Sequence, residues 1–204
     1  MVTRRFRRVI KEHGFFGGLV HLAYRFSPVQ ISLVFMMDVP ATTTAIPQIT
    51  IFRYSHLRDI GSELLQALAE ARGMALIRGF EQLFRIGAQL WMGFCGKEVA
   101  GICWSRSGLT RSDYFVPLET DDANILSCFM FPQFRGRGIY STMLKHITGT
   151  LKKHNGVRRV FIDCPSWNYP SIRGIEKAGF HIIGRAACIV LFGRVVFRYP
   201  RYIV

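Results

Sequence analysis

Apolar and polar positions follow two different periods along the chain. Short runs rich in β-branched and aromatic residues predict strands, which we expect over residues 31–37, 49–54, 89–95, 99–105, 125–131, 160–163, 181–192 and 195–199. Apolar positions that recur every three or four residues predict helices over residues 55–71, capped by Ser55, and over 75–84, 139–154 and 171–177. This order predicts a sheet with helices on its faces, so the expected fold class is α/β (α+β).

The first 47 residues differ in character from the rest. Residues 3–26 carry basic side chains beside apolar ones at helical spacing, which predicts a basic amphipathic helix. Its apolar face either packs on the domain, which is the commoner outcome, or lies on an anionic membrane surface. Residues 41–47 are typical of a linker. We therefore divide the chain into an N-terminal extension, residues 1–47, and a domain, residues 48–204.

The charge of the chain favours anionic partners. Its 204 residues include 27 basic and 13 acidic ones, which gives a net charge of +14. A nucleic acid, a membrane surface or a polyphosphate would suit this charge. The basic residues are dense between Gln133 and Val160, where no acidic residue occurs. Because the sequence has no base-reading aromatic motif, we expect no nucleic-acid partner.

The five cysteines are widely spaced, and most lie in apolar runs. They show neither the spacing of metal ligands nor a paired framework, so we expect free thiols in a reducing compartment and no metal site. The apolar region 15–37 is interrupted by His21, Arg25 and Pro28, which argues against a membrane-spanning helix. With no secretory signal visible, we expect a cytoplasmic protein, peripheral to the inner face of the membrane if residues 3–26 bind lipid.

The most informative segment is the sequence Gln-Phe-Arg-Gly-Arg-Gly at residues 133–138. It joins a predicted strand to a predicted helix, whose first N–H groups have no partner within the helix and face any ligand in front of it. Glycine allows positive φ and a close approach of the backbone to a phosphate. A P-loop would require G-x-x-x-x-G-K-[ST], and a dinucleotide-binding fingerprint would require a third glycine where Ser141 stands. Both patterns are missing, so the segment predicts an anion site of another kind.

Two motifs occur together downstream of this strand. The Q-x-x-G-x-G segment follows Met130-Phe131-Pro132, and Asn168-x-x-Ser171 then precedes Glu-Lys-Ala-Gly-Phe at residues 176–180. Together they resemble the GNAT acetyltransferase superfamily, and the order of elements from residue 49 onward is similar to its fold. The resemblance implies acetyl-CoA as co-substrate and no metal. It also implies a mixed, mostly antiparallel sheet that splays apart at the cofactor site.

The resemblance assigns cofactor contacts to three groups of residues. Phe129, Met130 and Phe131 match a bulged strand whose backbone N–H would hold the acetyl carbonyl. The pyrophosphate loop and the helix start are matched by Gln133, Phe134, Arg135, Gly136, Arg137, Gly138, Ile139, Tyr140 and Ser141. Asn168 and Ser171 match the contacts to the pantetheine arm, although an ordinary turn or helix cap would also explain Asn168.

Acetyl transfer to an amine requires a base, because a protonated amine cannot attack. Asp163 lies five residues before Asn168, where several family members carry a catalytic glutamate, and is our first candidate. Its alternative is a solvated or ion-paired strand residue. The rival bases are Glu119, Asp121 and Asp122 in the loop before the cofactor strand, with His181 ranked below them.

The proton donor departs from the family pattern. The family commonly has a tyrosine seven residues after the asparagine, where this chain has Ile175. The candidates to replace it are Tyr140, Tyr169 and a water molecule.

The sequence leaves three alternatives for the acceptor. The Gly138-Ile139-Tyr140 variant is similar to GNAT proteins associated with bacterial surface polysaccharide assembly, which favours an amino sugar or another small amine. A protein or peptide amine is the second alternative. The third is a non-catalytic module of this fold that binds CoA or a membrane surface. A monomer and a homodimer both fit the sequence.

Overall fold

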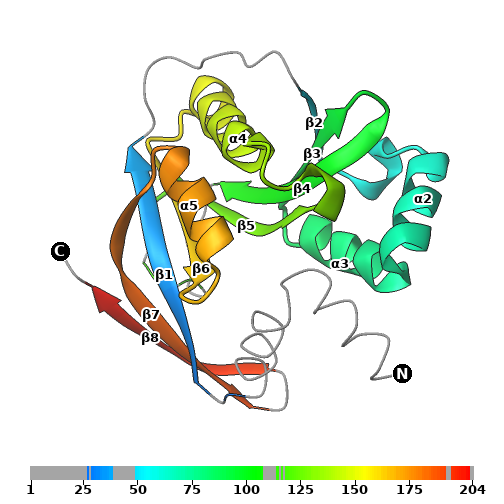
Figure 1. Ribbon diagram of the computed structural model, residues 1–204. Coiled ribbons are helices and arrows are strands. Elements are labelled where there is room, and N and C mark those ends of the chain that lie inside the picture. Colours follow the sequence, from blue (N-terminus) through cyan, green and yellow to red (C-terminus); the bar gives the residue numbers. More distant parts are fainter. Residues whose placement is uncertain are drawn as a thin grey trace.

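The computed structural model describes residues 27, 29–38, 49–107, 114, 116, 118–191 and 194–202 (Figure 1). The helix expected over residues 3–26 and the linker at 41–47 lie outside the described residues. Most of the loop expected between Ser107 and Asp122 lies outside them as well.

Strands and helices follow the order expected from the sequence. The strands are β1 (Val29–Asp38), β2 (Thr50–Tyr54), β3 (Gln89–Cys95), β4 (Glu98–Ser107), β5 (Asp122–Met130), β6 (Arg159–Pro165), β7 (His181–Leu191) and β8 (Arg194–Tyr202). The helices are α2 (Ser62–Arg72), α3 (Met74–Arg85), α4 (Ile139–Asn155) and α5 (Tyr169–Lys177), with short 3-10 turns at Leu57–Asp59 and Pro132–Phe134. One eight-stranded sheet runs in the order β2-β3-β4-β5-β6-β1-β7-β8. Only the β5–β6 pair among these is parallel, so the predicted mixed, mostly antiparallel sheet is confirmed.

Strand β1 is an inner strand of this sheet. It pairs antiparallel with β6 on one side and with β7 on the other. The division at residues 47 and 48 had assigned this strand to the extension. Its pairing ties it to strands that follow it by more than a hundred residues, which no local pattern could reveal.

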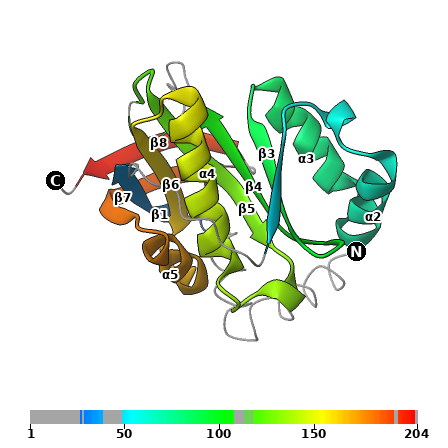
Figure 2. The same cartoon turned by 90° about the horizontal axis from the view of Figure 1, so that it is seen from above.

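Helices cover both faces of the sheet (Figure 2). On one face, His146 of α4 packs edge-on against Trp91 of β3, with ring centres 6.2 Å apart. On the other, Phe80 and Phe84 of α3 contact Trp104 of β4 at 5.3 and 4.8 Å. Helix α5 lies beside α4, and α2 beside α3.

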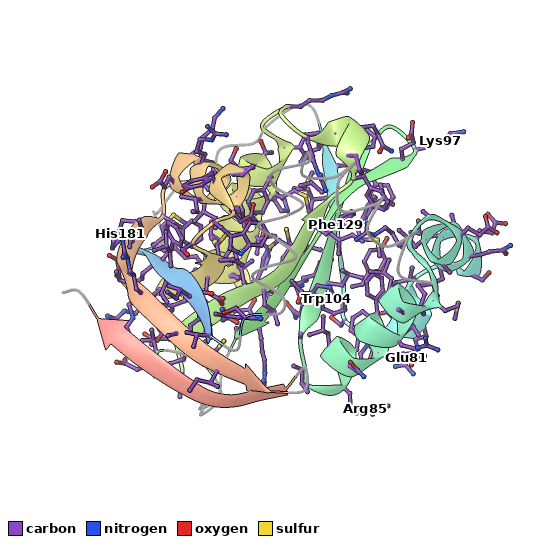
Figure 3. All side chains as sticks on the ribbon, turned by 60° about the horizontal axis from the view of Figure 1, so that its bottom comes forward. Glu81, Arg85, Lys97, Trp104, Phe129 and His181 are labelled. Atoms are coloured by element: carbon purple, nitrogen blue, oxygen red, sulfur yellow. The ribbon has the colours of Figure 1, made fainter. Side chains whose placement is uncertain are left out.

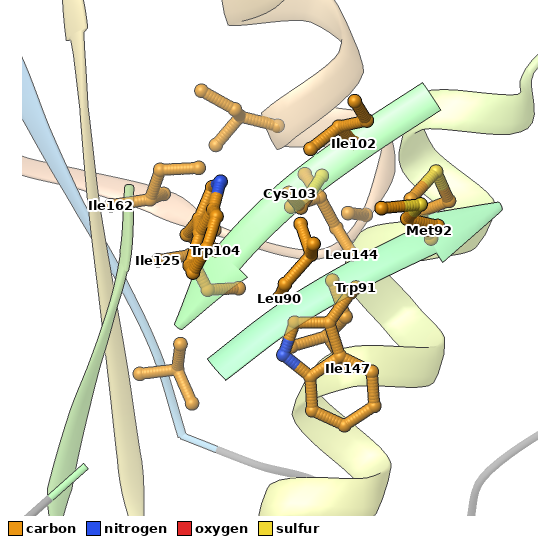
Figure 4. Packing of buried hydrophobic residues seen from close by; sticks show 14 of the residues in the cluster. Leu90, Trp91, Met92, Ile102, Cys103, Trp104, Ile125, Leu144, Ile147 and Ile162 are labelled. Atoms are coloured by element: carbon orange, nitrogen blue, oxygen red, sulfur yellow. The ribbon is translucent and has the colours of Figure 1, made fainter. Parts of the chain in front are cut away.

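Apolar side chains fill the space between α4 and the strands. Leu144 and Ile147 of α4 are fully buried against the face of β3 that carries Trp91 (Figure 4). The indole Nε1–H of Trp91 donates to the Ser105 hydroxyl at 2.8 Å, so its polar group is satisfied inside this layer. The packing fixes α4, and therefore the loop that precedes it, against the sheet.

The first helix of the domain begins later than the sequence predicted. The Asp59 carboxylate accepts the backbone N–H groups of Ser55 and His56, at 3.3 and 2.8 Å. These bonds hold residues 55–59 in a separate turn, and α2 starts only after Gly61. The expected cap at Ser55 was therefore wrong: the residue donates to a later carboxylate and caps nothing.

Candidate functional site

Strands β5 and β6 separate halfway along their length. Their parallel pairing extends from Asp122 and Arg159 only to Ile125 and Ile162. Beyond this point β5 continues to Met130 and β6 continues to Pro165. The opening between the two strands is the splay of the sheet, and it lies at the end where the glycine loop follows β5.

A β-bulge in β5 lies at the start of this splay. Trp104 of β4 is opposite Leu126 while Ile102 is opposite Phe129, so two residues of β5 face the single residue Cys103. These two are Ser127, whose φ of 49° is left-handed, and Cys128. The resemblance matched residues 129–131 to a bulged strand, and the bulge in β5 directly precedes them, with the left-handed backbone at Ser127.

The strand end after the bulge presents its backbone groups to both sides. The N–H of Phe131 donates to the Ala100 carbonyl of β4 at 3.0 Å. Because N–H groups alternate sides along a strand, the N–H of Met130 points to the opposite edge, toward the splay. Of the three residues assigned to the acetyl carbonyl, Met130 therefore has the suitable orientation.

The glycine loop has the backbone shape that a phosphate cradle requires. Gly136 and Gly138 both have φ of 76°, and Gly138 is the N-cap of α4. A Cβ built at Gly136 would meet no atom within 4 Å, so the space in front of the loop is open. The first N–H groups of α4 have no acceptor inside the helix and face this space. Its residues therefore fit the pyrophosphate of a bound CoA.

The side chains of the loop have different surroundings. Phe134 is buried, whereas Gln133 and Arg137 are exposed, with the Arg137 guanidinium 5.6 Å from the Phe134 ring centre. Arg135 donates from Nε to the Met130 carbonyl at 3.1 Å, which ties the loop to the end of β5. The Ser141 hydroxyl donates to the Gly138 carbonyl at 2.8 Å, so it stabilises the helix start.

Lys177 is a residue of this site that sequence reasoning missed. Its Nζ lies 3.9 Å from the position that a Cβ would take at Gly138, although Lys177 belongs to the end of α5. An ammonium group at this position adds positive charge beside the cradle. Its place in the Glu-Lys-Ala-Gly-Phe motif was visible in the sequence, but only the packing of α5 on α4 brings it to the loop.

Tyr140, in the first turn of α4, packs against α5 beside the splay. Its ring packs so closely on α5 that a Cβ at Gly174 would come 2.5 Å from Cδ1 of the ring. The Ser171 hydroxyl donates to the Tyr140 phenol oxygen at 3.5 Å, a long hydrogen bond. Burial first, and then the neighbouring thiols of Cys128 and Cys103, raise the pKa of Tyr140 well above its usual value. The phenol is therefore neutral and carries its proton at physiological pH.

The start of α5 forms the other wall of the splay. Asn168 is the N-cap of α5, and its carbonyl accepts the N–H groups of Ser171 and Ile172, both at 3.0 Å. Its side chain makes no capping hydrogen bond to the described first turn of α5, unlike an ordinary helix cap. Burial raises the pKa of the nearby Cys164 thiol to about 11. Ile175 is fully buried, so the family's tyrosine position belongs to the core here.

Asp163 lies on β6 just past the last residue that pairs with β5. The Cys164 thiol reaches toward the Asn168 carbonyl of α5 at 3.9 Å. Because successive side chains of a strand point to opposite faces, the half-buried Asp163 points to the face of α2 and α3. His181, the remaining base candidate on a strand, is exposed at the start of β7 (Figure 3).

The three acidic residues before β5 lie at the opposite end of the strand. Asp122 is buried and accepts two hydrogen bonds from Arg159, at 2.8 and 2.9 Å. Glu119 pairs with the same Arg159 at 3.1 Å, and Asp121 pairs with Arg158 at 3.3 Å. A nine-residue strand separates them from the loop, a length of roughly 30 Å. The structure therefore does not bring Glu119 to the splay.

Comparisons of the sequence and of the structure with known proteins both find acetyltransferases of one family. The model of the acetyltransferase (GNAT) family matches residues 75–180, just over half of the chain. An acetyltransferase from the GNAT family of Colwellia psychrerythraea is 16% identical with a TM-score of 0.53, covering 83% of this chain and 59% of that one. No curated protein sequence matches the chain.

Two further solved structures share the fold. A tandem GNAT protein from the clavulanic acid biosynthesis pathway is 16% identical with a TM-score of 0.54, covering 84% of this chain and 56% of that one. A GCN5-related N-acetyltransferase from Sphaerobacter thermophilus is 16% identical with a TM-score of 0.50, covering 85% and 55%. The chain thus spans less than two thirds of the length of each of these proteins.

Membrane-spanning helices and metal sites are both missing from the described part of the chain. None of its helices combines the length and the apolar character that crossing a bilayer requires. Among the same residues, no three His, Cys, Asp or Glu side chains come together as a metal site. None of the five cysteines forms a disulfide.

Proposed function

Because the chain belongs to the acetyltransferase (GNAT) family, we propose that it transfers the acetyl group of acetyl-CoA to a primary amine by direct attack in a ternary complex. The observation that carries the proposal is the pair of left-handed glycines, Gly136 and Gly138, at the start of α4 beside the splay. Open space in front of Gly136 and the nearby Lys177 ammonium both favour a polyphosphate ligand there.

When bound, acetyl-CoA supplies the acetyl group as a thioester. In this proposal the backbone N–H groups of loop residues 133–138 and of the first turn of α4 hold the pyrophosphate, and Asn168 and Ser171 line the pantetheine arm. The N–H of Met130 donates to the acetyl carbonyl oxygen and stabilises the negative charge that develops on it. Phe129 and Phe131 fix that strand end by facing β4 with their own N–H groups.

Asp163 serves as the base in this proposal. Its carboxylate points to the face opposite α4, from which an amine can approach the splay while the cofactor occupies the α4 side. Taking a proton from the amine makes its lone pair available for attack. We leave Glu119 out of this role, since Arg159 holds it at the far end of β5.

Tyr140 takes the place of the missing family tyrosine as proton donor. It reaches the splay from α4 and keeps its proton, because burial opposes formation of the phenolate. The leaving thiolate can receive this proton, and the phenolate then regains one from solvent, either directly or through Ser171, which takes a proton from water as it gives up its own. Ser171 is within reach, at 3.5 Å from the phenol oxygen.

The acceptor in our proposal is an amino sugar or another small amine, and a protein or peptide amine is the alternative. A module of this fold that binds CoA or a membrane surface without catalysis is the second alternative, motivated by Ile175. Cysteines without disulfide bonds are in keeping with a reducing, cytoplasmic setting, which we include in the proposal. The proposal also includes peripheral membrane contact through residues 3–26. It allows either a monomer or a homodimer.

Release of CoA thiol from acetyl-CoA in the presence of an amine library tests the function directly. We expect thiol release that depends on the amine, and a large loss of turnover in Asp163→Asn with near-normal acetyl-CoA binding. Asp121→Asn is the matched control, because its carboxylate pairs with Arg158 at the distant end of the strand. Amine-dependent turnover that is equal in the two variants would remove Asp163 from the mechanism. Binding of acetyl-CoA without transfer to any amine would favour the non-catalytic alternative.

A further inference from the structure

The ring of Phe129 lies on the face of the sheet from which the acceptor reaches the splay in the proposed reaction. Trp104 contacts α3, and Ile102 shares its face two residues away on β4. Phe129 is opposite Ile102 in the sheet, so its ring also lies on the α2 and α3 side (Figure 3). Asp163 points to this same face. The proposed base and the Phe129 ring therefore both flank the approach to the splay.

Two arginines from different elements converge on this ring. The Arg72 guanidinium carbon lies 3.9 Å from the ring centre of Phe129, a close cation–π contact. The Arg135 guanidinium carbon lies 5.9 Å from the same centre. One half-buried ring thus brings two positive charges together next to the end of β5.

Both arginines are held in place by the backbone around them. Arg72 is the last residue of α2, and the N–H of the following Gly73 bonds to the Ala69 carbonyl at 2.6 Å, which fixes the helix end. Arg135 is anchored through its Nε–H to the Met130 carbonyl. Arg72 comes from a helix on the other face of the sheet, so its position does not depend on the cofactor loop.

We propose that Arg72, with Arg135, recognises an anionic group on the acceptor, so that the acceptor is a primary amine that also carries a phosphate or a carboxylate. The inference rests on the proposed acetyl transfer and names the substrate class of the same site. In neutral solution a primary amine carries a positive charge, and two guanidinium groups repel it. A carboxylate or phosphate on the same molecule is attracted to the guanidinium groups and can accept paired hydrogen bonds from them.

Paired acceptors that differ only in the anionic group test this assignment. D-glucosamine 6-phosphate against D-glucosamine probes a phosphate, and L-alanine against L-alaninamide probes a carboxylate. For the wild-type chain we expect kcat/KM at least about tenfold higher for the member of one pair that carries the anionic group, which also distinguishes a phosphate from a carboxylate. In Arg72→Gln this ratio should fall about tenfold while the Kd of acetyl-CoA stays unchanged, and Arg72→Lys should recover part of it. Arg78→Gln, on the exposed side of α3, is the control and should behave like wild type.

A binding measurement covers the case in which none of these amines is the substrate. With the cofactor site saturated by CoA, inorganic phosphate should raise the Tm of the wild-type chain but not that of Arg72→Gln. Preference for the amines that lack the anionic group, an unchanged ratio in Arg72→Gln, or an equal phosphate shift in both proteins would overturn the inference. Failure of the wild-type chain to bind acetyl-CoA at all would instead overturn the proposed function.

Discussion

At one end of the parallel β5–β6 pair the strands are held together by Asp122 and Arg159, whereas at the other end they part around a bulge and a glycine loop. The closed end buries a carboxylate and compensates it with a guanidinium and a backbone N–H. The open end instead collects backbone N–H groups, basic side chains and a neutral phenol. Stability is thus concentrated where the strands are joined, and the capacity to bind an anion is concentrated where they separate.

Breaking the closed end should produce the largest effect. Asp122→Ala removes a fully buried carboxylate and leaves Arg159 and the N–H of Glu119 without it. Loss of one partner of such a pair costs about 3 kcal/mol of unfolding free energy, measurable by urea denaturation. Asp121→Ala should cost less than about 1 kcal/mol, because its partner Arg158 is 75% exposed. Equal losses in the two variants would show that burial of the pair does not hold this end together.

At the open end, the phenol of Tyr140 should matter for turnover and little for stability. Tyr140→Phe keeps the ring that packs on Gly174 and removes only the hydroxyl. We expect kcat to fall about 100-fold, with the Kd of acetyl-CoA nearly unchanged. Tyr169→Phe, at a side chain 66% exposed on α5, should leave kcat as it is. If the two phenylalanine variants turn over equally, water supplies the proton and Tyr140 is only a packing residue.

The charge beside the cradle is the next contrast to test. Lys177→Gln removes the ammonium near Gly138, and we expect the Kd of CoA to rise about tenfold. The change should shrink at high ionic strength and vanish for pantetheine, which lacks the pyrophosphate. Lys153→Gln, in the last turn of α4 at the other end of the helix, serves as the matched control. A similar loss of pantetheine affinity would mean that Lys177 acts through the fold.

The smallest expected effect concerns His146, which lies on α4 between the two ends. Burial lowers its pKa below the usual value. The unfolded chain therefore takes up the proton first as the pH falls, and His146 makes the fold less stable from about pH 6.5 down to its folded pKa. Urea denaturation at pH 7.5 and 5.5 should show a slightly larger acid loss for the wild-type chain than for His146→Gln, by less than about 0.5 kcal/mol. An identical acid loss in both proteins would rule this contribution out.

Local sequence patterns were sufficient to predict much of the open end. Gly136 and Gly138 could be predicted because a strand that turns directly into a helix needs left-handed residues, and both glycines are left-handed. The apolar repeat of α4 predicted its start at Ile139 correctly. The bulge could not be placed in the same way, since Ser127 is not a residue type that signals a positive φ.

The features that sequence reasoning missed depend on distant parts of the chain. Arg159 pairs with Asp122 and Glu119 across more than thirty residues, which holds these candidate bases at the closed end, away from the splay. Lys177 reaches Gly138 only because α5 packs on α4. Strand β1 enters the sheet between two strands that follow it far along the chain. Such contacts follow from tertiary packing and leave no local period in the sequence.

The most direct test of the central claim is the affinity of acetyl-CoA for two matched glycine variants, measured by isothermal titration calorimetry. Gly136 and Gly96 have φ of 76° and 61°, and a Cβ at either would meet open space, so Gly136→Asp and Gly96→Asp impose similar backbone strain. Only Gly136→Asp puts a carboxylate in the cradle, where it repels a pyrophosphate. We predict that Gly136→Asp raises Kd at least about 30-fold while Gly96→Asp, in the β3–β4 hairpin, binds like wild type. Equal affinity of the two variants would contradict the assignment of the loop as the cofactor site.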